Sequence, residues 1–377
     1  MAGAAAPGEL TASAATRFAV ASEKDNAAIR RLLRNNPMRG EVDLTFEREP
    51  DYFRGVDLAG GEDQTIVAIR DSHLVCMGRC SQRDCWVDGQ MRRAGYLAEL
   101  RLDGSARGRF GIVRDGYRFF RSLQDDNSSD LYFTSIAADN ERARRFLEAG
   151  ARGLPTYGFL AELDTLLLAV PRRAKAAKLR VRTATVADVP DLVRVLNDHG
   201  RRHQLTTVWT PERIALLEGH GLPIERFLVA TPGEEIVACG ALWDQRGFRQ
   251  TVIRGYAPLI SAVRPLLNMA SRVLGKPGLP APSSVLAHAF LSPLAFTHGS
   301  ETMLPDFIQA CFPIAAQAGL EFLTIALPAM DGRLPELRRR FATRTYRSRL
   351  YRVDWPDRSF MRIQTHEAPV LPDVAFL

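Results

Sequence analysis

Two stretches of this chain, 163 positions apart, share one pattern, and this similarity constrains the fold more than any other feature. FAVASEKDNAAIRRLL begins at Phe18 and VRTATVADVPDLVRVL begins at Val181, with a constant offset, for example 184 − 21 = 163. In each copy a short alternating strand leads into Ser22 or Thr185, a helix N-cap residue type, and an apolar stripe at helical spacing follows. Two ordinary strand-helix starts could match by chance. We interpret the pattern as a tandem duplication, two domains of the same fold.

Composition marks the boundary between the copies. The apolar run LDTLLLAV is followed by PRRAKAAK, a proline with a basic run of small side chains that is typical of a linker. The sequence predicts a disordered N-terminus (1–16), a first domain (17–171), a linker (172–178), a second domain (179–357) and a C-terminal tail (358–377). We call residues 17–171 the N-terminal half and residues 179–357 the C-terminal half.

The composition is that of a soluble globular protein, with 46% apolar and 25% charged residues and a net charge of +7. No apolar run approaches the roughly 20 residues of a membrane helix, and the first residues lack the pattern of a secretory signal. Five cysteines, an odd number, fit a reducing compartment, so we expect a cytoplasmic protein. The arginines are scattered and no zinc finger, helix-turn-helix or RNP-like motif accompanies them, so we expect neither a nucleic-acid nor a membrane partner.

Cys76, Cys80 and Cys85 lie close together but match no standard zinc spacing, and no histidine follows at a ligand interval. We expect small buried side chains on a hairpin there, and no metal.

The stretch YLAELRLDGSARGRFGIVRDGYRFF is an apolar strand, a loop with two arginines and three glycines, and then a helical pattern. Backbone amides at a helix N-terminus, glycines that let the main chain approach and arginines that donate charged hydrogen bonds together make a phosphate site. Earlier, the stretch EREPDYFRG is predicted as a helical patch before two β-rich runs. After the loop, the pattern predicts a helix over about 111–123, the strand DLYFTSIA, and a helix starting at Asp139 or Asn140.

This order of elements resembles the GNAT superfamily of acyl-CoA-dependent N-acetyltransferases. There, the strand before the loop ends in Arg/Gln-x-x-Gly-x-Gly/Ala, and the loop amides bind the pyrophosphate of coenzyme A. Phe110 and Ile112 stand where that family has its glycines, so the loop is longer or follows another path. The resemblance implies coenzyme contacts from the strand end and the loop, namely Leu100, Leu102, Arg107, Gly108, Arg109, Phe110, Gly111 and Ile112.

A second signature is the segment NERARRFLEAG, which resembles the Asn-x-x-Ala helix of the same family. Asn140, Ala143 and Phe146 occupy its positions, and the resemblance implies that they contact the cofactor too. A Rossmann loop would follow the first strand of its unit, whereas several elements precede this one. The implied fold class is α/β (α+β), with two tandem GNAT-like domains, each a mixed, mostly antiparallel sheet flanked by helices.

The activity implied by the resemblance is transfer of an acyl group from acetyl-CoA, or another acyl-CoA, to the amine of a small molecule or peptide. Glu99 interrupts the apolar run of its strand and is the candidate general base, although it could instead face solvent or pair with an arginine. Phe146 and Leu147 stand where the family has a proton-donating tyrosine. Tyr157 could supply that proton or could be a packed anchor. Without a donor, either the thiolate departs unaided or the protein binds acyl-CoA as a sensor or scaffold.

The C-terminal half lacks an equivalent phosphate loop, because THGSETML contains no arginine and one glycine. An added helical segment, PLISAVRPLLNMASRVLG, lies before its fourth strand. We expect this half to have lost coenzyme binding and to serve as a substrate wall, a partner for the other domain or a homodimer surface.

Overall fold

The computed structural model describes residues 16–56, 58, 63–106, 108, 110–124, 129–173, 177–356 and 361–377. The predicted disordered segment lies outside the described residues except for Thr16, and so do Arg107 and Arg109 of the phosphate loop. Of the predicted linker, residues 174–176 are likewise outside them.

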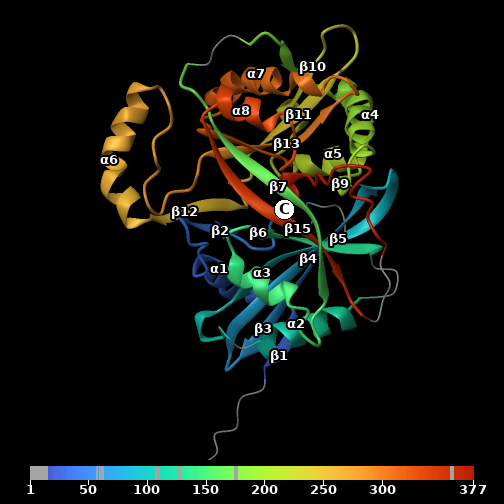
Figure 1. Cartoon of the computed structure of the whole chain (residues 1–377), viewed down its shortest axis with the longest axis vertical. Coiled ribbons are helices and arrows are strands. Elements are labelled where there is room, and N and C mark those ends of the chain that lie inside the picture. The colour runs from blue at the N-terminus through green and yellow to red at the C-terminus, as the bar shows by residue number, and fades with distance from the viewer. Residues whose placement is uncertain are drawn as a thin grey trace, which may run out of the picture.

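Strands and helices are both distributed over the described residues (Figure 1). The strands are β1 (Arg17–Val20), β2 (Val42–Glu47), β3 (Asp63–Arg70), β4 (His73–Val87), β5 (Gln90–Leu102), β6 (Leu131–Ala137), β7 (Thr156–Ala169), β8 (Val181–Thr183), β9 (Thr206–Thr207), β10 (Phe227–Ala230), β11 (Ala238–Trp243), β12 (Gln250–Tyr256), β13 (His288–Phe296), β14 (Phe322–Pro328) and β15 (Thr343–Asp354). The α-helices are α1 (Asn26–Arg34), α2 (Phe110–Ser122), α3 (Glu141–Glu148), α4 (Val189–Gly200), α5 (Pro211–Glu218), α6 (Pro258–Val273), α7 (Leu304–Gln317) and α8 (Leu334–Arg340). Among the described residues, β2 to β5 and β10 to β12 follow one another without an α-helix between them.

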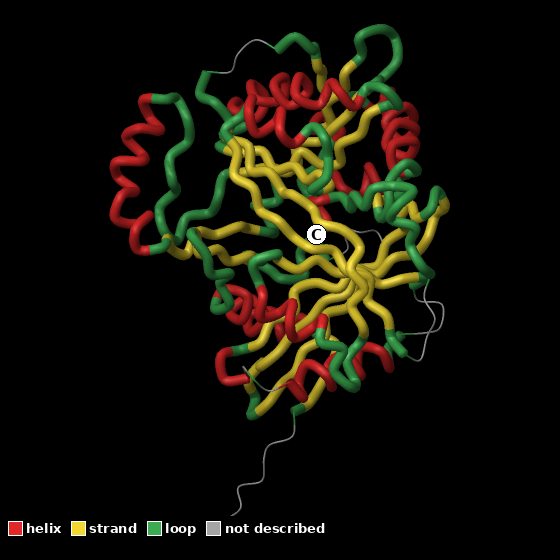
Figure 2. Tube along the Cα trace, in the orientation of Figure 1, coloured by secondary structure: helices red, strands yellow, loops and turns green. Residues whose placement is uncertain are grey.

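Within the described ranges, thirteen strands form one sheet that runs through the molecule (Figure 2). Its order is β1-β3-β4-β5-β6-β15-β7-β14-β13-β11-β10-β8, with β9 paired to β4. The pairs β5–β6 and β13–β14 are parallel, and the other neighbours are antiparallel. This confirms the predicted fold class of a mixed, mostly antiparallel sheet flanked by helices.

The centre of the sheet is built from strands of both halves. β15, which comes last in the chain, lies between β6 and β7, while β7 lies between β15 and β14. Figure 1 shows the two long strands side by side through the middle of the molecule. Inward from either end, the sheet has three antiparallel pairings and then one parallel pairing, β5–β6 or β13–β14. The next strand comes from the other half: β15 follows β6, and β7 follows β14. The division into two duplicated domains is compatible with this strand order and stays a prediction.

The two similar strand-helix starts fold alike. The backbone amide of Ser22 donates to Asp25 Oδ2 at 2.9 Å, and that of Thr185 donates to Asp188 Oδ2 at 2.8 Å. Both are capping boxes, in which side chain and backbone satisfy each other across the first turn.

The expected helical patch at EREPDYFRG is wrong. Its first residue, Glu47, ends β2, and no α-helix covers the described residues up to Val56. β2 pairs with β12 of the other half in a separate two-stranded sheet. The alternating run VDLTFE favours a strand. The carboxylates of Glu47, at the end of the run, and of Glu49, just after it, both pair with Arg34 of α1.

The added helix predicted in the C-terminal half is α6, which follows β12 and stands apart from the sheet (Figure 1). None of the sixteen described residues of α6 is buried. In the part of the chain that the structure describes, no helix is long and apolar enough to cross a bilayer.

Candidate active site

The neighbouring parallel strands β5 and β6 separate partway along their length. They pair from Ala94↔Leu131 to Leu97↔Thr134, and no further pair joins them among the described residues. At the point of separation, the hydroxyl of Thr134 donates to the carbonyl oxygen of Leu97 at 2.6 Å. On its other edge, β6 pairs with β15 from Tyr132 to Ala137, both before and beyond this point. The end of β5 therefore has backbone groups that no longer bond to β6, as direct recognition of a ligand by the main chain requires.

A cavity of about 830 Å³ opens at this separation and is lined by both halves. From the N-terminal half it is bordered by β5, the start of α3 and one face of α2; from the C-terminal half it is bordered by β12, β13 and the loop after α6. Most of its lining is apolar, with a few charged groups near Glu99. Such a cavity is large enough for a drug-sized ligand.

The loop after β5 leads directly into the N-terminus of α2. Gly108 has a φ of +85°, in the left-handed region that favours glycine. A Cβ built on Gly111 would meet no described atom closer than the Arg114 side chain at 4.0 Å. The first turn of α2 thus offers unpaired amides beside a backbone with free space above it, which suits an anion.

Phe110 and Ile112, the side chains at the family's two glycine positions, differ in exposure. Phe110 is 62% exposed and its ring stacks on Phe146 of α3, with centroids 4.9 Å apart. Ile112 is buried in the core under β3 and β4 together with Leu102. Leu100 lines the cavity, whereas Leu102, Ile112 and Phe146 do not border it. Of these predicted cofactor contacts, Leu100 is placed at the cavity and the other three have packing roles here.

The helix α3 begins as predicted, at Asn140. The side chain of Asn140 accepts a hydrogen bond from the amide of Ala143 at 3.2 Å, which is an N-cap. Both residues line the cavity, across from α2. The start of α3 and the inner face of α2 therefore border the same cavity.

Tyr157 lies at the start of β7 and its hydroxyl bonds to the hydroxyl of Tyr117 on α2. Both residues line the cavity. Burial raises the pKa of Tyr157 well above its ordinary value, and burial also raises the pKa of Tyr117 to about 12. At neutral pH both phenols are protonated, so Tyr157 can donate a proton or a hydrogen bond. Tyr117 was not among the predicted site residues, although its spacing from Val113 and Phe120 places it on the inner face of α2.

Glu99 lies at a β-bulge of β5 with a φ of +55°, where the register against β4 shifts between Met77 and Arg79. Its carboxylate accepts from Arg48 Nε at 3.0 Å and Nη2 at 2.5 Å, and from the Tyr52 hydroxyl at 3.0 Å. Burial alone would raise the pKa of Glu99, but the positive charges of Arg48 and Arg79 outweigh it and lower the pKa to about 2. Glu99 is therefore ionised, paired with an arginine, and a poor proton acceptor.

Arg48, Arg249 and His288 are among the polar side chains of this cavity that were not predicted as site residues. Arg48 follows β2, Arg249 precedes β12, and His288 begins β13. The imidazole of His288 contacts the hydroxyls of Thr324 at 3.0 Å and Thr251 at 3.4 Å. Burial lowers the pKa of His288 to about 4, so the ring is neutral near pH 7. No local motif marks these residues, because elements far apart in sequence bring them together.

In the C-terminal half, the corresponding helix is α7, and its first residues are not accessible to a ligand. Leu304 and Pro305, the first residues of α7, are buried, and the guanidinium of nearby Arg202 donates to the carbonyl oxygen of Phe296 at 2.6 Å and pairs with Glu301 at 3.3 Å. This contrasts with Phe110 and Gly111, the exposed first residues of α2.

No protein-family model matches this sequence, and no curated protein matches it significantly. Solved structures do match the fold. A GCN5-related N-acetyltransferase from Sphaerobacter thermophilus superposes with a TM-score of 0.57 at 12% identity, covering 92% of this chain and 98% of that one. N-myristoyltransferase from Saccharomyces cerevisiae with bound myristoyl-CoA superposes with a TM-score of 0.59 at 11% identity, covering 97% of this chain and 91% of that one. The chain therefore has the fold of the GNAT superfamily.

Proposed function

We propose that this protein is an N-acyltransferase that moves an acyl group from an acyl-CoA to an amine, with the coenzyme held by the N-terminal half. The observation that carries the proposal is the separation of β5 from β6 at Leu97 over a cavity bordered by α3 and by the face of α2 that holds Val113 and Tyr117. The first residues of α2, Phe110 and Gly111, are exposed, and a pyrophosphate would be bound at this helix N-terminus. Fold neighbours that are N-acetyltransferases, and one that has bound myristoyl-CoA, support the same interpretation.

The reaction needs one bond made and one broken. The lone pair of a neutral amine attacks the thioester carbonyl carbon, the new C–N bond forms, and the C–S bond breaks to release the thiol of coenzyme A. The negative charge that develops on the carbonyl oxygen would be stabilised by a backbone N–H at the end of β5 that β6 does not engage. The proton lost by the amine balances the proton gained by the thiolate.

Tyr157 and Glu99 have different proposed roles in the cavity. Tyr157, protonated at neutral pH, is the proposed donor to the departing thiolate. The low pKa of Glu99 favours a positioning role, in which it orients Arg48 and Tyr52, over the role of base. His288 is neutral and lies at the cavity wall, where its two ring nitrogens contact the hydroxyls of Thr324 and Thr251.

The cavity also bears on the size of the substrates. A volume of about 830 Å³ with a mostly apolar lining has room for the thiol end of the coenzyme, the acyl group and an acceptor together.

The test is release of free thiol from acetyl-CoA, and from acyl-CoAs of increasing chain length, in the presence of amino acids, polyamines and peptide N-termini. We expect release that depends on an amine, with the N-acyl product detected by mass spectrometry. The proposal fails if no amine raises thiol release above the background hydrolysis of the thioester.

A second function, a sensor or scaffold that binds acyl-CoA without turnover, is favoured by one observation. The carboxylate at the base position, Glu99, is locked in an ion pair with Arg48. Under this alternative, coenzyme A binds but none of the amines reacts, so calorimetric binding without thiol release would distinguish the two.

A further inference from the structure

Two arginines, one from each half, lie at the cavity wall. Glu47 of β2 and Gln250 of β12 are the last partners in the register of the two-stranded sheet. Arg48 follows Glu47, Arg249 precedes Gln250, and the positive charge of Arg48 acts on Arg249. Both arginines line the cavity; Arg48 is buried and Arg249 is partly buried. Like charges close together are unfavourable unless something neutralises them.

Arg48 keeps one donor group without a partner. Its side chain is 4% exposed, and its Nε and Nη2 donate to Glu99. No described residue accepts a hydrogen bond from its Nη1, which is buried. A buried charged donor without an acceptor is costly, so such a group in a cavity wall points to a ligand.

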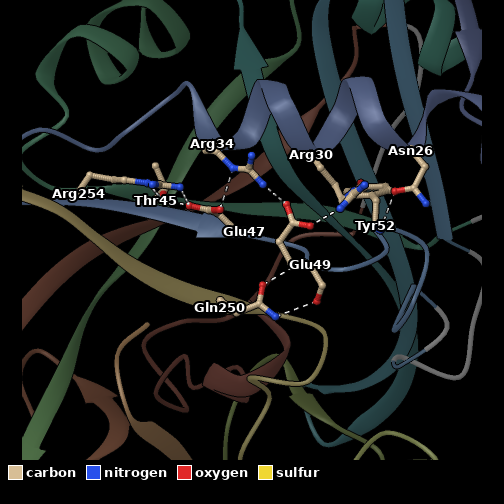
Figure 3. A network of polar contacts seen from close by, with 9 residues as sticks. All are labelled: Asn26, Arg30, Arg34, Thr45, Glu47, Glu49, Tyr52, Gln250 and Arg254. Atoms are coloured by element: carbon tan, nitrogen blue, oxygen red, sulfur yellow. Dashed lines mark hydrogen bonds and ion pairs between the residues drawn. The ribbon is translucent and has the colours of Figure 1, made fainter. Parts of the chain in front are cut away.

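The carboxylates on either side of Arg48 are already engaged elsewhere. Figure 3 shows Glu47 bound by Arg34 and Arg254, and Glu49 bound by Arg30 and Arg34. The backbone of Glu49 is also clamped to the Gln250 side chain through two hydrogen bonds of 2.9 Å. These contacts hold the backbone on both sides of Arg48. Because Glu47 and Glu49 are paired with other arginines, they do not neutralise Arg48.

Arg249 donates to main-chain oxygens of Ala375, at 3.4 Å, and of Leu377, the last residue of the sequence. Burial, together with the positive charge of Arg48, lowers the pKa of Arg249 to about 10, which still leaves it protonated at neutral pH. Of the nearby acidic side chains, Asp63 is bound by Arg79 and Glu99 by Arg48. Among the described residues, no aspartate or glutamate side chain is paired with Arg249.

We propose that Arg48 and Arg249 bind a carboxylate of the acceptor, so that the acceptor is an amine carrying a carboxylate close to its amino group, with an apolar body. This inference rests on the proposed acyl transfer. An α-amino acid with an apolar side chain has these features: its carboxylate would accept from Arg48 Nη1, and its side chain would lie against the apolar lining. Guanidinium groups bind carboxylates through paired, charged hydrogen bonds.

The same carboxylate could belong to the acyl group of a dicarboxylic acyl-CoA. Succinyl-CoA paired with an uncharged amine therefore forms one arm of the experiment, and acetyl-CoA paired with amino acids forms the other. Preference for the first arm would assign the arginine pair to the donor and overturn the acceptor assignment.

The primary experiment uses the unmodified full chain and matched acceptors: leucine, leucinamide and 3-methylbutylamine, with the equivalent sets for phenylalanine and methionine. The amide's amino group has the lower pKa and is the better nucleophile near pH 7, so a preference for the amino acid cannot come from intrinsic reactivity. We expect kcat/KM for the best amino acid to exceed that of its amide by roughly tenfold or more. Equal or higher kcat/KM for the amide would overturn the proposal.

The arginines are tested by the ratio of these two rate constants. Because both are measured on one preparation, the ratio does not depend on the fraction that is folded. We expect Arg249→Met and Arg48→Lys to bring the ratio close to one, mainly through a higher KM for the amino acid. Arg39→Met, which removes an exposed arginine paired with Asp43, should leave the ratio unchanged. A ratio that survives in both Arg249→Met and Arg48→Lys would contradict the assignment.

A binding measurement separates this inference from the acyltransferase proposal. N-acetyl-leucine, N-acetyl-phenylalanine and N-acetyl-methionine are titrated by calorimetry against their amides. Tighter binding of the acid, lost in Arg249→Met, supports the carboxylate site even if no amine is acylated. If no acid binds more tightly than its amide, the carboxylate site is refuted, whether or not thiol release occurs.

Discussion

Tyr157 and Tyr117 share a hydrogen bond inside the cavity, and only the first is proposed to donate a proton. Replacing Tyr157 with Phe removes the donor and keeps the ring that packs near Tyr351. We expect kcat to fall roughly 100-fold with an unchanged dissociation constant for coenzyme A, because general acid catalysis contributes about this much. Steady-state thiol release and calorimetry measure the two quantities.

Tyr117→Phe is the matched control, since it removes the partner hydroxyl but leaves the proposed donor. Its effect on kcat should be smaller. A Tyr157→Phe variant that turns over like the unmodified protein would show that the thiolate leaves unaided.

We expect the ionisation of Glu99 to make the free energy of unfolding depend on pH. Its pKa of about 2 in the folded protein lies below the roughly 4.3 of an unfolded chain, so its ionised form stabilises the fold at neutral pH. That contribution is complete above the unfolded value and is lost as the pH falls from about 5 towards 2. We expect Glu99→Gln to lower the free energy of unfolding by about 2 kcal/mol at pH 7, with a difference that shrinks on acidification.

Urea denaturation of both proteins between pH 7 and pH 3.5 measures this difference. A base with no structural role would instead lower turnover and leave stability unchanged. A stability gap that widens on acidification would contradict the ion pair between Glu99 and Arg48.

For single residues, the sequence was informative about candidates and silent about their partners. Glu99 stood out as an acid in an apolar strand, but its pairing with Arg48 depends on a contact across 51 positions. Arg48 itself follows the alternating run VDLTFE and belongs to no motif, and Arg249 comes from the other half. Residue chemistry can be inferred locally, whereas charge balance in a cavity requires the tertiary structure.

The N-terminus of α2 is the element on which the proposed coenzyme binding depends. Gly111→Asp would place a carboxylate in its first turn, where there is space for a side chain. A negative charge there favours the helix dipole by about 0.3–1 kcal/mol but repels a pyrophosphate. We expect thermal stability to be kept or raised while the dissociation constant for coenzyme A rises at least about tenfold.

Gly233→Asp is a suitable control for this variant, because it makes the same charge change at an open turn of the C-terminal half. Its coenzyme affinity should match that of the unmodified protein. Unchanged affinity in Gly111→Asp would place the pyrophosphate elsewhere.

Elements with local signals were predictable. Asn140 caps α3, and Ser22 and Thr185 lead capping boxes, because each interaction spans three residues. β2 and β12 were not recognised as partners, since about 200 residues separate them and neither contains a turn signal pointing to the other. The helical interpretation of EREPDYFRG failed for the same reason: its acids are used in contacts with α1 and β12.

The sheet as a whole ties the two halves together through β7 and β15. If residues 17–171 are expressed alone, β6 loses its neighbour β15 and leaves an unpaired strand edge. We expect this fragment to aggregate or to lack a cooperative thermal transition by circular dichroism. The full chain should unfold in one transition.

A fragment in which residues 343–355 are joined to 17–171 by a flexible linker restores the missing strand and should regain a transition. Cooperative folding of 17–171 alone would show that the exchanged strand is dispensable. The repeat at a constant offset suggested two similar units, but an exchange of their last strands leaves no trace in either copy, so the continuous sheet could not be predicted.

Across the whole molecule, we propose that one half binds the coenzyme and the other does not. Calorimetric titration of the full chain with coenzyme A tests this most directly, because α2 has an open N-terminus while the start of α7 is buried. We predict one site per chain, weakened in Gly111→Asp and retained in Gly233→Asp. A stoichiometry of two, or an absence of binding, would contradict it.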